Sequence, residues 1–331
     1  MRIPGLKTAK LLSRWLQGRV NGGALILGYH RIASPSKDQY EICVSPTHFA
    51  EHLEILRKHA HPIRLSDLVE HLKQGTLPRK SVAVTFDDGY ADNLHNAEPL
   101  LEQYQMPATV FVSTAYLGEE FWWDELERLV MDAPALPPSL RLKIRAEPFE
   151  WVSMPLEEEP GNPAEQSARK ELIKALYFRL LPLEMEACKE VISELKNMFG
   201  SQARRDTTQR ALTTAELSGL SNSGWVEIGA HSVSHPVLPH LSAAQQQTEV
   251  QQSKVFLEEL LEKPVLGFAY PHGKFNAQTQ SAVKAAGYSF ACSSQAGQAW
   301  QNQQRYALPR IWPQDWDGER FSRMLRFWLG I

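Results

Sequence analysis

Short apolar runs alternate with amphipathic segments along most of the chain, which is the pattern of a parallel α/β fold. We expect buried strands at 24–29, 81–86, 108–112, 225–230, 265–270 and 288–292. Between these runs, Pro46–Lys58 has helical spacing, with Ser45 as an N-cap before a proline, and Asp92–Tyr104 is also helical. This alternation predicts a parallel sheet, open or closed into a barrel.

Residues 120–215 interrupt the alternation. Seven of the 21 prolines fall between Pro134 and Pro163. Two alternating segments, 140–145 and 149–154, are typical of a small hairpin, and 164–199 is helical with a break near Pro182. We therefore expect an N-terminal helix at 1–22, an α/β body formed by 23–119 and 216–331, and a hairpin-plus-helix insertion at 120–215.

The first 31 residues contain six basic side chains and no acidic one. Their apolar positions have helical spacing, so residues 1–22 predict a basic amphipathic helix. Such a helix can lie on an anionic membrane surface, or it can pack on its own domain. The residues alone leave both interpretations open.

Composition and charge exclude several classes of protein. Apolar residues make up 43% and charged residues 22%, as in globular proteins. The net charge is −3, from 35 basic and 38 acidic residues, which argues against a nucleic-acid partner. The three cysteines are widely separated, and the N-terminus lacks the unbroken apolar core of a signal peptide. We expect a cytoplasmic protein, with a peripheral contact with the inner membrane surface as a further option.

Two adjacent carboxylates, Asp87 and Asp88, follow the apolar run 81–86 directly. Buried carboxylates at this spacing are costly unless a cation or a proton lies between them. Because neighbouring residues on a strand point in opposite directions, one carboxylate can bind a metal while the other faces a water molecule. The alternative is a simple turn in which an aspartate caps a helix.

His231 and His235 follow the apolar run 225–230. Four residues of separation bring two imidazoles to one point, and one carboxylate would complete three protein ligands, the catalytic arrangement for zinc and similar ions. His30 also lies at a strand end, where a lone histidine is more often structural than catalytic. All these residues, together with the turn 268–273, fall at the carboxyl ends of predicted strands, where α/β active sites lie.

The segments T-F-D-D-G (85–89) and H-S-x-x-H-P (231–236) resemble the first two motifs of the polysaccharide deacetylase superfamily, also called the NodB-homology or carbohydrate esterase family four superfamily. The resemblance covers residues 24–31, 81–116 and 225–290, and it leaves out the insertion. It implies that Asp87 is the catalytic base and that Asp88, His231 and His235 hold the metal.

The chain departs from the family pattern at its later motifs. The third motif is R-x-P-Y in the family, whereas this chain has Ala269–His272, so the arginine beside the base is missing. The late D-x-x-D-W and L-x-x-H motifs are absent as well. Tyr29–Ile32 resembles an early element of the circularly permuted branch typified by poly-N-acetylglucosamine deacetylases, which implies that His30 is the acid. The resemblance therefore predicts an irregular (β/α) barrel with fewer than eight strands, and we expect Arg310 to replace the missing arginine.

The prediction is a metal-dependent hydrolase that removes an N-acetyl or related small acyl group from an amino sugar. The expected metal is zinc, with nickel, cobalt and iron as alternatives. The expected substrate is an N-acetylated sugar, oligosaccharide or lipid-linked sugar. Candidate substrate-binding residues are Tyr270, Pro271, His272, Trp123 and Asp124. The alternatives are a non-haem iron oxygenase, since two histidines and a carboxylate also suit iron, and a catalytically silent carbohydrate-binding protein of the same fold.

Overall fold

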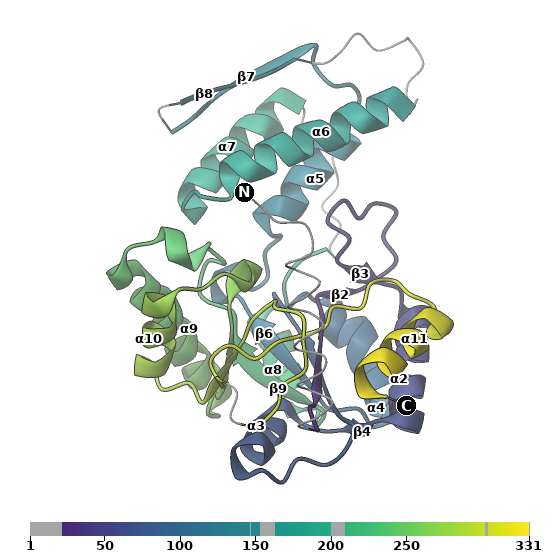
Figure 1. Ribbon diagram of the computed structural model, residues 1–331. Coiled ribbons are helices and arrows are strands. Elements are labelled where there is room, and N and C mark those ends of the chain that lie inside the picture. The colour runs from purple at the N-terminus through teal and green to yellow at the C-terminus, as the bar shows by residue number, and fades with distance from the viewer. Residues whose placement is uncertain (1–21, 146, 153–162, 200–208, 302–303, 331) are drawn as a thin grey trace, which may run out of the picture. The chain divides into compact units, whose positions relative to one another are not determined.

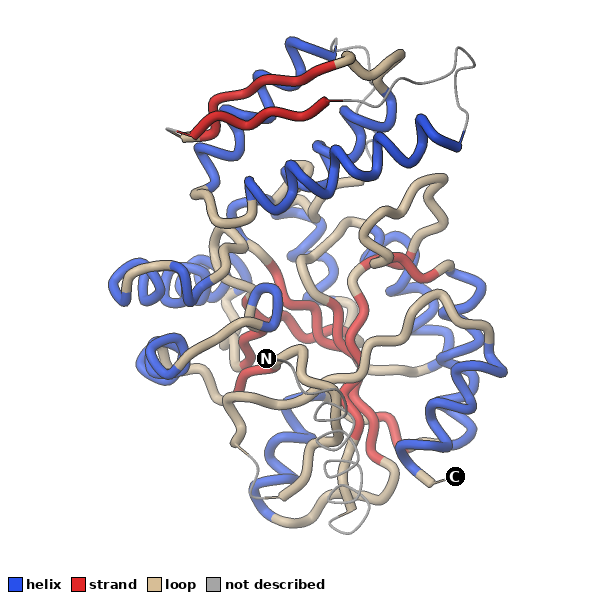
Figure 2. The backbone as a smooth tube through the Cα atoms, turned by 45° about the horizontal axis from the view of Figure 1, so that its top comes forward, coloured by secondary structure: helices blue, strands red, loops and turns tan. Residues whose placement is uncertain are grey.

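A curled sheet of seven parallel strands forms the centre of the computed structural model, which describes residues 22–145, 147–152, 163–199, 209–301 and 304–330. The strand order is β1-β5-β6-β9-β10-β11, and the short strand β4 pairs with the beginning of β5. The strands are β1 (Leu25–Tyr29), β4 (His61–Pro62), β5 (Ser81–Phe86), β6 (Ala108–Val112), β9 (Val226–Ala230), β10 (Gly267–Ala269) and β11 (Phe290–Cys292). All six predicted strands are confirmed, and Figure 2 shows them side by side among the helices.

Helices surround this sheet in two groups. They are α2 (Pro46–His59), α3 (Leu65–Gln74), α4 (Glu98–Tyr104), α8 (Thr214–Asn222), α9 (Ala243–Leu261), α10 (Ala277–Ala285) and α11 (Gly318–Leu329). Helix α2 packs against α4 and α11, whereas α9 packs against α8 and α10 (Figure 1). A two-stranded sheet of β2 (Arg31–Ile32) and β3 (Cys43–Val44) lies beyond β1. Strand and helix side chains together bury a large apolar cluster and a second, smaller one.

Local sequence signals account for the helix boundaries. Ser45 caps α2 by accepting a hydrogen bond from the His48 amide at 3.3 Å, as predicted. The helix expected over 92–104 is divided, because it begins with a π-helical turn, Asn93–Ala97, before α4 starts at Glu98. Pro99 has no amide proton to donate, so the regular hydrogen-bond ladder is interrupted there.

An irregular segment closes the gap between the two edge strands of the sheet. Ile311 bridges to Leu27 of β1, and Leu308 bridges to Cys292 of β11. The bridge to β1 uses two backbone hydrogen bonds of 2.8 and 2.9 Å, which involve Gly28 and Ile26. The sheet is therefore a barrel of irregular closure, and the late segment 308–311 lies at its seam.

The chain divides into two compact units, one comprising Met1–Gly118 and Ala211–Ile331, the other Glu119–Arg210. The second unit contains α5 (Trp122–Asp132), β7 (Ser139–Ile144), β8 (Glu147–Val152), α6 (Pro163–Leu180) and α7 (Met185–Phe199). The antiparallel pairing of β7 with β8 confirms the predicted hairpin. The second unit ends at Arg210, a few residues before residue 215, where the insertion was expected to end. Leu212 already belongs to the first unit, because its amide donates to the Gly89 carbonyl and its carbonyl accepts the Gly118 amide.

The N-terminal helix expected at 1–22 falls outside the described residues, apart from Gly22. Within the described part of the chain, no helix combines the length and the apolar character needed to cross a membrane.

Candidate metal and catalytic site

The turn after β5 places two adjacent carboxylates at the mouth of the barrel. Asp87 donates its amide to the Tyr29 carbonyl at 2.9 Å, which continues the pairing of β5 with β1. Asp88 and Gly89 then adopt left-handed conformations, with φ of 72° and 84°. A β-carbon on Gly89 would approach the Val112 side chain to 3.1 Å, so glycine suits this turn. Both carboxylates are almost fully buried as a result.

Asp88, His231 and His235 form a buried cluster whose candidate ligand atoms all lie within 4.8 Å of one another. Oδ1 of Asp88 lies 3.5 Å from Nε2 of His231 and 3.3 Å from Nε2 of His235. His231 follows β9, and its Nδ1 contacts the Ala269 carbonyl at 2.8 Å. This contact places the proton on Nδ1 and directs the lone pair of Nε2 toward Asp88, the orientation that metal-binding histidines adopt.

The cluster fits a divalent cation. Tetrahedral coordination at about 2.0–2.1 Å separates neighbouring ligand atoms by about 3.3 Å, close to the distances between Asp88 and the two histidines. Oδ1 of Asp88 is buried and has no hydrogen-bond partner within the described residues. Burial lowers the pKa of His231 to about 4 and that of His235 to about 3, while burial raises the pKa of Asp88. The imidazoles are thus neutral, as ligands must be, and a cation would favour the ionised carboxylate.

Asp87 faces a second buried charge, the guanidinium of Arg310. The two groups form a bidentate pair, with N–O distances of 2.6 and 2.7 Å. Arg310 also donates to the Ser293 carbonyl and to Thr85 Oγ1. Burial raises the pKa of Asp87, but the charge and hydrogen bonds of Arg310, together with the neighbouring His231 and His30, outweigh it and the pKa falls to about 2. Arg310 therefore lies beside Asp87, where the sequence led us to expect it, and it holds that carboxylate ionised.

His30 lies at the end of β1 and faces the same site. Its ring stacks on that of Trp312, with centroids 4.9 Å apart and planes inclined by 23°. The guanidinium of Arg310 lies 4.5 Å from the centre of the same indole. A β-carbon on Gly28 would approach the indole to 2.8 Å, so glycine leaves room for it. Trp312 was not predicted from the sequence, and its position two residues after Arg310 is the only signal that could have indicated it.

The turn after β10, Tyr270–Gly273, contributes backbone groups and one imidazole. The amides of Gly273 and Lys274 donate to the carbonyls of Tyr270 and Pro271 within the turn. The His272 ring lies 4.5 Å from that of His235. The Tyr270 side chain, by contrast, is fully buried and donates its hydroxyl to the Tyr306 carbonyl. The Tyr270 side chain therefore packs in the core, and a contact of Tyr270 with substrate stays a prediction.

The other candidate substrate-binding residues are also largely buried. Pro271 is buried beneath the turn. Trp123 and Asp124 belong to α5 in the second unit, where both are buried and Trp123 stacks on Phe121 at 4.6 Å. Their contact with a substrate stays a prediction.

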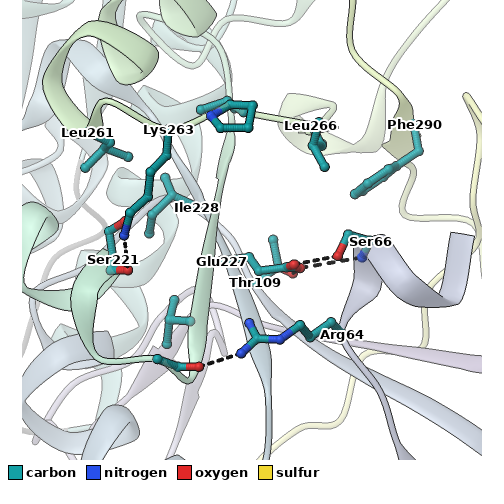
Figure 3. Close-up of a pocket in the computed structure, with 15 residues that line it drawn as sticks. Arg64, Ser66, Thr109, Ser221, Glu227, Ile228, Leu261, Lys263, Leu266 and Phe290 are labelled. Carbon is teal, nitrogen blue, oxygen red and sulfur yellow. Dashed lines mark hydrogen bonds between the residues drawn. The ribbon is translucent and has the colours of Figure 1, made fainter. Parts of the chain in front are cut away.

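A separate cavity of about 360 Å³ lies at the amino-terminal ends of β9 and β10, at the opposite end of these strands from His231. Figure 3 shows its lining. Its charged side chains, Arg64, Glu227 and Lys263, are each hydrogen-bonded within the wall. Because each of these three side chains already has a hydrogen-bond partner in the wall, the Asp88 cluster is the stronger candidate for chemistry.

Comparison with known proteins agrees with this geometry. A sequence model described as "Polysaccharide deacetylase" matches residues 74–133 and 196–291, which include all three cluster residues and Asp87. The poly-beta-1,6-N-acetyl-D-glucosamine N-deacetylase of Staphylococcus aureus (strain MSSA476) is 34% identical over 110 residues, or 29% of this chain. That alignment spans 38% of the length of the relative.

Two solved structures share the fold. IcaB from Ammonifex degensii superimposes with a TM-score of 0.60 and 16% identity, over 93% of this chain and 97% of that one. The Streptococcus pyogenes deacetylase PplD, in complex with acetate, superimposes with a TM-score of 0.59 and 20% identity, over 92% and 98%. The chain is therefore similar in sequence to polysaccharide deacetylases over the matched segments, and it shares the fold of these two structures.

Proposed function

We propose that this protein is a metal-dependent hydrolase that removes an acetyl group, or a related small acyl group, from the nitrogen of an amino sugar. The observation that carries the proposal is the Asp88–His231–His235 cluster next to an ionised Asp87 at the mouth of the barrel. The family match supports the reaction class. The partial relative acts, by its name, on a polymer of N-acetylglucosamine, which supports an N-acetylated sugar as substrate.

Asp88, His231 and His235 would hold the cation, with zinc as the preferred metal. A divalent cation there supplies Lewis acidity, which polarises an acyl carbonyl and acidifies a water molecule. Asp87 accepts the proton of the attacking water on a carboxylate oxygen. Arg310 keeps both oxygens of Asp87 fixed and the carboxylate ionised, so the base is ready at neutral pH.

The remaining groups act on the amide itself. The backbone amide of His272, in the turn after β10, stabilises the negative charge that develops on the carbonyl oxygen. His30 donates a proton to the departing nitrogen, since an amine anion is a very poor leaving group. Trp312 stacks on the His30 ring and orients it.

The experiment is a mass-spectrometric search for a loss of about 42 Da, the mass of C₂H₂O, across a panel of N-acetylated monosaccharides, oligosaccharides and lipid-linked sugars. Acetate is assayed in parallel, and oxygen consumption is recorded. Equimolar acetate without oxygen uptake supports the hydrolase, whereas oxygen uptake would indicate the non-haem iron oxygenase. The Asp87→Asn variant is the matched control, because an amide keeps the shape of the side chain but accepts no proton.

A protein that binds metal and sugar without releasing acetate from any compound of the panel would instead be a carbohydrate-binding member of the fold. The intact set of Asp87, Asp88, His231 and His235 favours catalysis. Calorimetry on the same panel measures which sugars bind, and the acetate assay measures which sugars are hydrolysed. Binding without acetate release identifies the carbohydrate-binding protein.

A further inference from the structure

His30, the proposed general acid, lies where the chain changes its strand partner. Strand β1 pairs with β5 as far as Tyr29, and β2 pairs with β3 from Arg31 onward. His30 lies between these two strands, so neither ladder pairs it with a partner residue. Its side chain is half-buried, and its ring stacks on Trp312. The backbone of His30 therefore depends on groups outside the sheet for its position.

The π-helical turn before α4 supplies such groups. Asn93 donates from Nδ2 to the His30 carbonyl at 2.8 Å. Asn96, three residues later in the same turn, donates from Nδ2 to the Ile32 carbonyl at 2.7 Å. Two side chains of one turn thus bind the segment 30–32, and the bond from Asn93 ends on His30 itself. Such π-helical turns are rare, and they occur frequently at functional sites.

Neighbouring groups settle the orientation of the Asn93 amide. Its Nδ2 also donates to Oδ1 of Asp92 at 3.3 Å. A carbonyl oxygen and an ionised carboxylate oxygen only accept hydrogen bonds, so the nitrogen of the amide is the atom that faces both. Asp92 is fixed in turn by the Ile32 amide and by Nε of Arg31, each at 2.9 Å. Asn93 and Asp92 are both buried, so little water competes with these bonds.

The position of a general acid decides how well it works. The donor has to lie within hydrogen-bond reach of the departing nitrogen, at about 2.6–3.2 Å between heavy atoms. A displacement of about 1 Å can cost about 10²-fold in rate. Trp312 contacts the ring of His30, whereas Asn93 holds the backbone from which that ring projects. Loss of the bond from Asn93 would therefore release the base of the side chain.

We propose that Asn93 is a positioning residue for proton donation: its amide holds the His30 carbonyl and thereby keeps the imidazole at the departing nitrogen. This inference rests on the proposed function. Asp92 contributes by orienting the Asn93 amide. The hydrogen bonds of that amide go to His30 and Asp92, so its removal should affect proton donation and leave the metal cluster intact.

The test uses the metal-loaded full chain with two variants of Asn93 and one matched control. Asn93→Ala removes the amide without adding bulk, and Asn93→Leu removes the donor while filling most of the space. Asn96→Ala is the control, because Asn96 donates a bond of the same kind from the same turn, but to Ile32. Urea denaturation and elemental analysis of the same samples report on folding and on bound metal.

Two substrates separate proton donation from the other steps. The best N-acetylated sugar of the panel has a nitrogen leaving group, which departs only with a proton. p-Nitrophenyl acetate releases p-nitrophenolate, a stable anion that departs without one, so its hydrolysis needs no general acid. A merely structural role of Asn93 would affect both substrates alike.

We expect both Asn93 variants to lose about 10- to 100-fold in kcat on the sugar, with KM within about threefold of the wild-type value. On p-nitrophenyl acetate the loss should be less than about threefold, and Asn96→Ala should lose less than about threefold on either substrate. Metal content should not change. No loss on the sugar, equal losses on both substrates, loss of metal, or recovery of activity in Asn93→Leu would each overturn the inference, as would equal losses in Asn93→Ala and Asn96→Ala.

A double variant tests whether Asn93 acts through His30. His30→Ala already lacks the acid, so adding Asn93→Ala to it should not slow the sugar reaction further. A further loss in the double variant would show that Asn93 acts by another route and would refute the positioning role.

The wild-type reaction separates this inference from the proposed function. A wild-type protein that releases no acetate from any sugar refutes the proposed function and this inference with it. Wild-type turnover of a sugar, combined with normal turnover in both Asn93 variants, refutes the role of Asn93 alone.

Discussion

Arg310 and Asp87 form a fully buried bidentate ion pair across 223 residues of sequence. The pairing depends on the irregular segment 308–311, which bridges β1 and β11 at the barrel seam. The segment 308–311 thus places the guanidinium of Arg310 beside the carboxylate of Asp87, which follows β5. The arginine of the family motif R-x-P-Y corresponds in this chain to Ala269, the last residue of β10.

Breaking this ion pair should destabilise the protein. Arg310→Met leaves Asp87 buried without a counter-charge, so we expect the free energy of unfolding to fall by about 3–5 kcal/mol. The double variant Arg310→Met/Asp87→Asn removes the uncompensated charge and should recover part of this loss. Urea denaturation of the two single variants and the double variant gives the coupling energy. Additive effects in the double variant would contradict the buried pair.

The sequence predicted the strands of the barrel well, because each of the six runs becomes a largely buried strand and is therefore mostly apolar. It also predicted that Asp88, His231 and His235 lie together, since parallel strands bring their carboxyl ends to one edge. The short strands β2, β3 and β4 were not predicted. Each has only two residues, too few for a periodic pattern, and their pairing depends on tertiary contacts.

Removing the candidate ligands should separate metal binding from proton transfer. We expect Asp88→Ala, His231→Ala and His235→Ala each to lose bound metal and activity, because each removes one of three ligands. Asp87→Asn should keep the metal and lose turnover. Elemental analysis of dialysed protein measures the metal content. Full occupancy in His231→Ala would contradict the ligand assignment.

Individual contacts at the site were harder to predict than its location. Tyr270 lies in the turn next to the cluster, yet its hydroxyl bonds to the Tyr306 carbonyl in the core. Trp312 gave no motif signal, but the space above Gly28 admits its indole, which stacks on His30. Which way a side chain points at a strand end depends on neighbours from distant segments, and a single sequence does not contain that information.

His30 should act on the rate and not on the metal. We expect His30→Ala to keep its metal content and fold but to lose about 10²–10⁴ in kcat, the usual effect of removing a general acid. Trp312→Leu removes the stacking partner while leaving His30 in place, so its loss should be smaller. Steady-state kinetics on the best sugar substrate, with metal analysis of the same samples, measures both. Normal turnover in His30→Ala would transfer the acid role to another residue.

His52 should make the free energy of unfolding fall at acidic pH. Its Nε2 donates to the Trp316 carbonyl at 2.7 Å, its Nδ1 contacts the Tyr29 hydroxyl at 3.2 Å, and its ring stacks on Phe321 at 4.0 Å. Burial lowers the pKa of His52 to about 4, although the bond to Trp316 opposes this shift. The neutral ring is therefore the form that the folded state requires.

The free energy of unfolding falls with falling pH because the native and unfolded states differ in proton binding at His52. Unfolded His52 has a pKa near 6.5, so between about pH 6.5 and pH 4 the unfolded chain binds a proton that the native protein does not. The stabilisation is complete above pH 6.5 and is lost as the pH falls to about 4, by about 1.4 kcal/mol per pH unit and about 3 kcal/mol in total. His52→Gln keeps a donor and an acceptor but does not titrate. Urea denaturation at several pH values should therefore show a shallower acid slope in His52→Gln, and parallel curves for the two proteins would contradict the assignment.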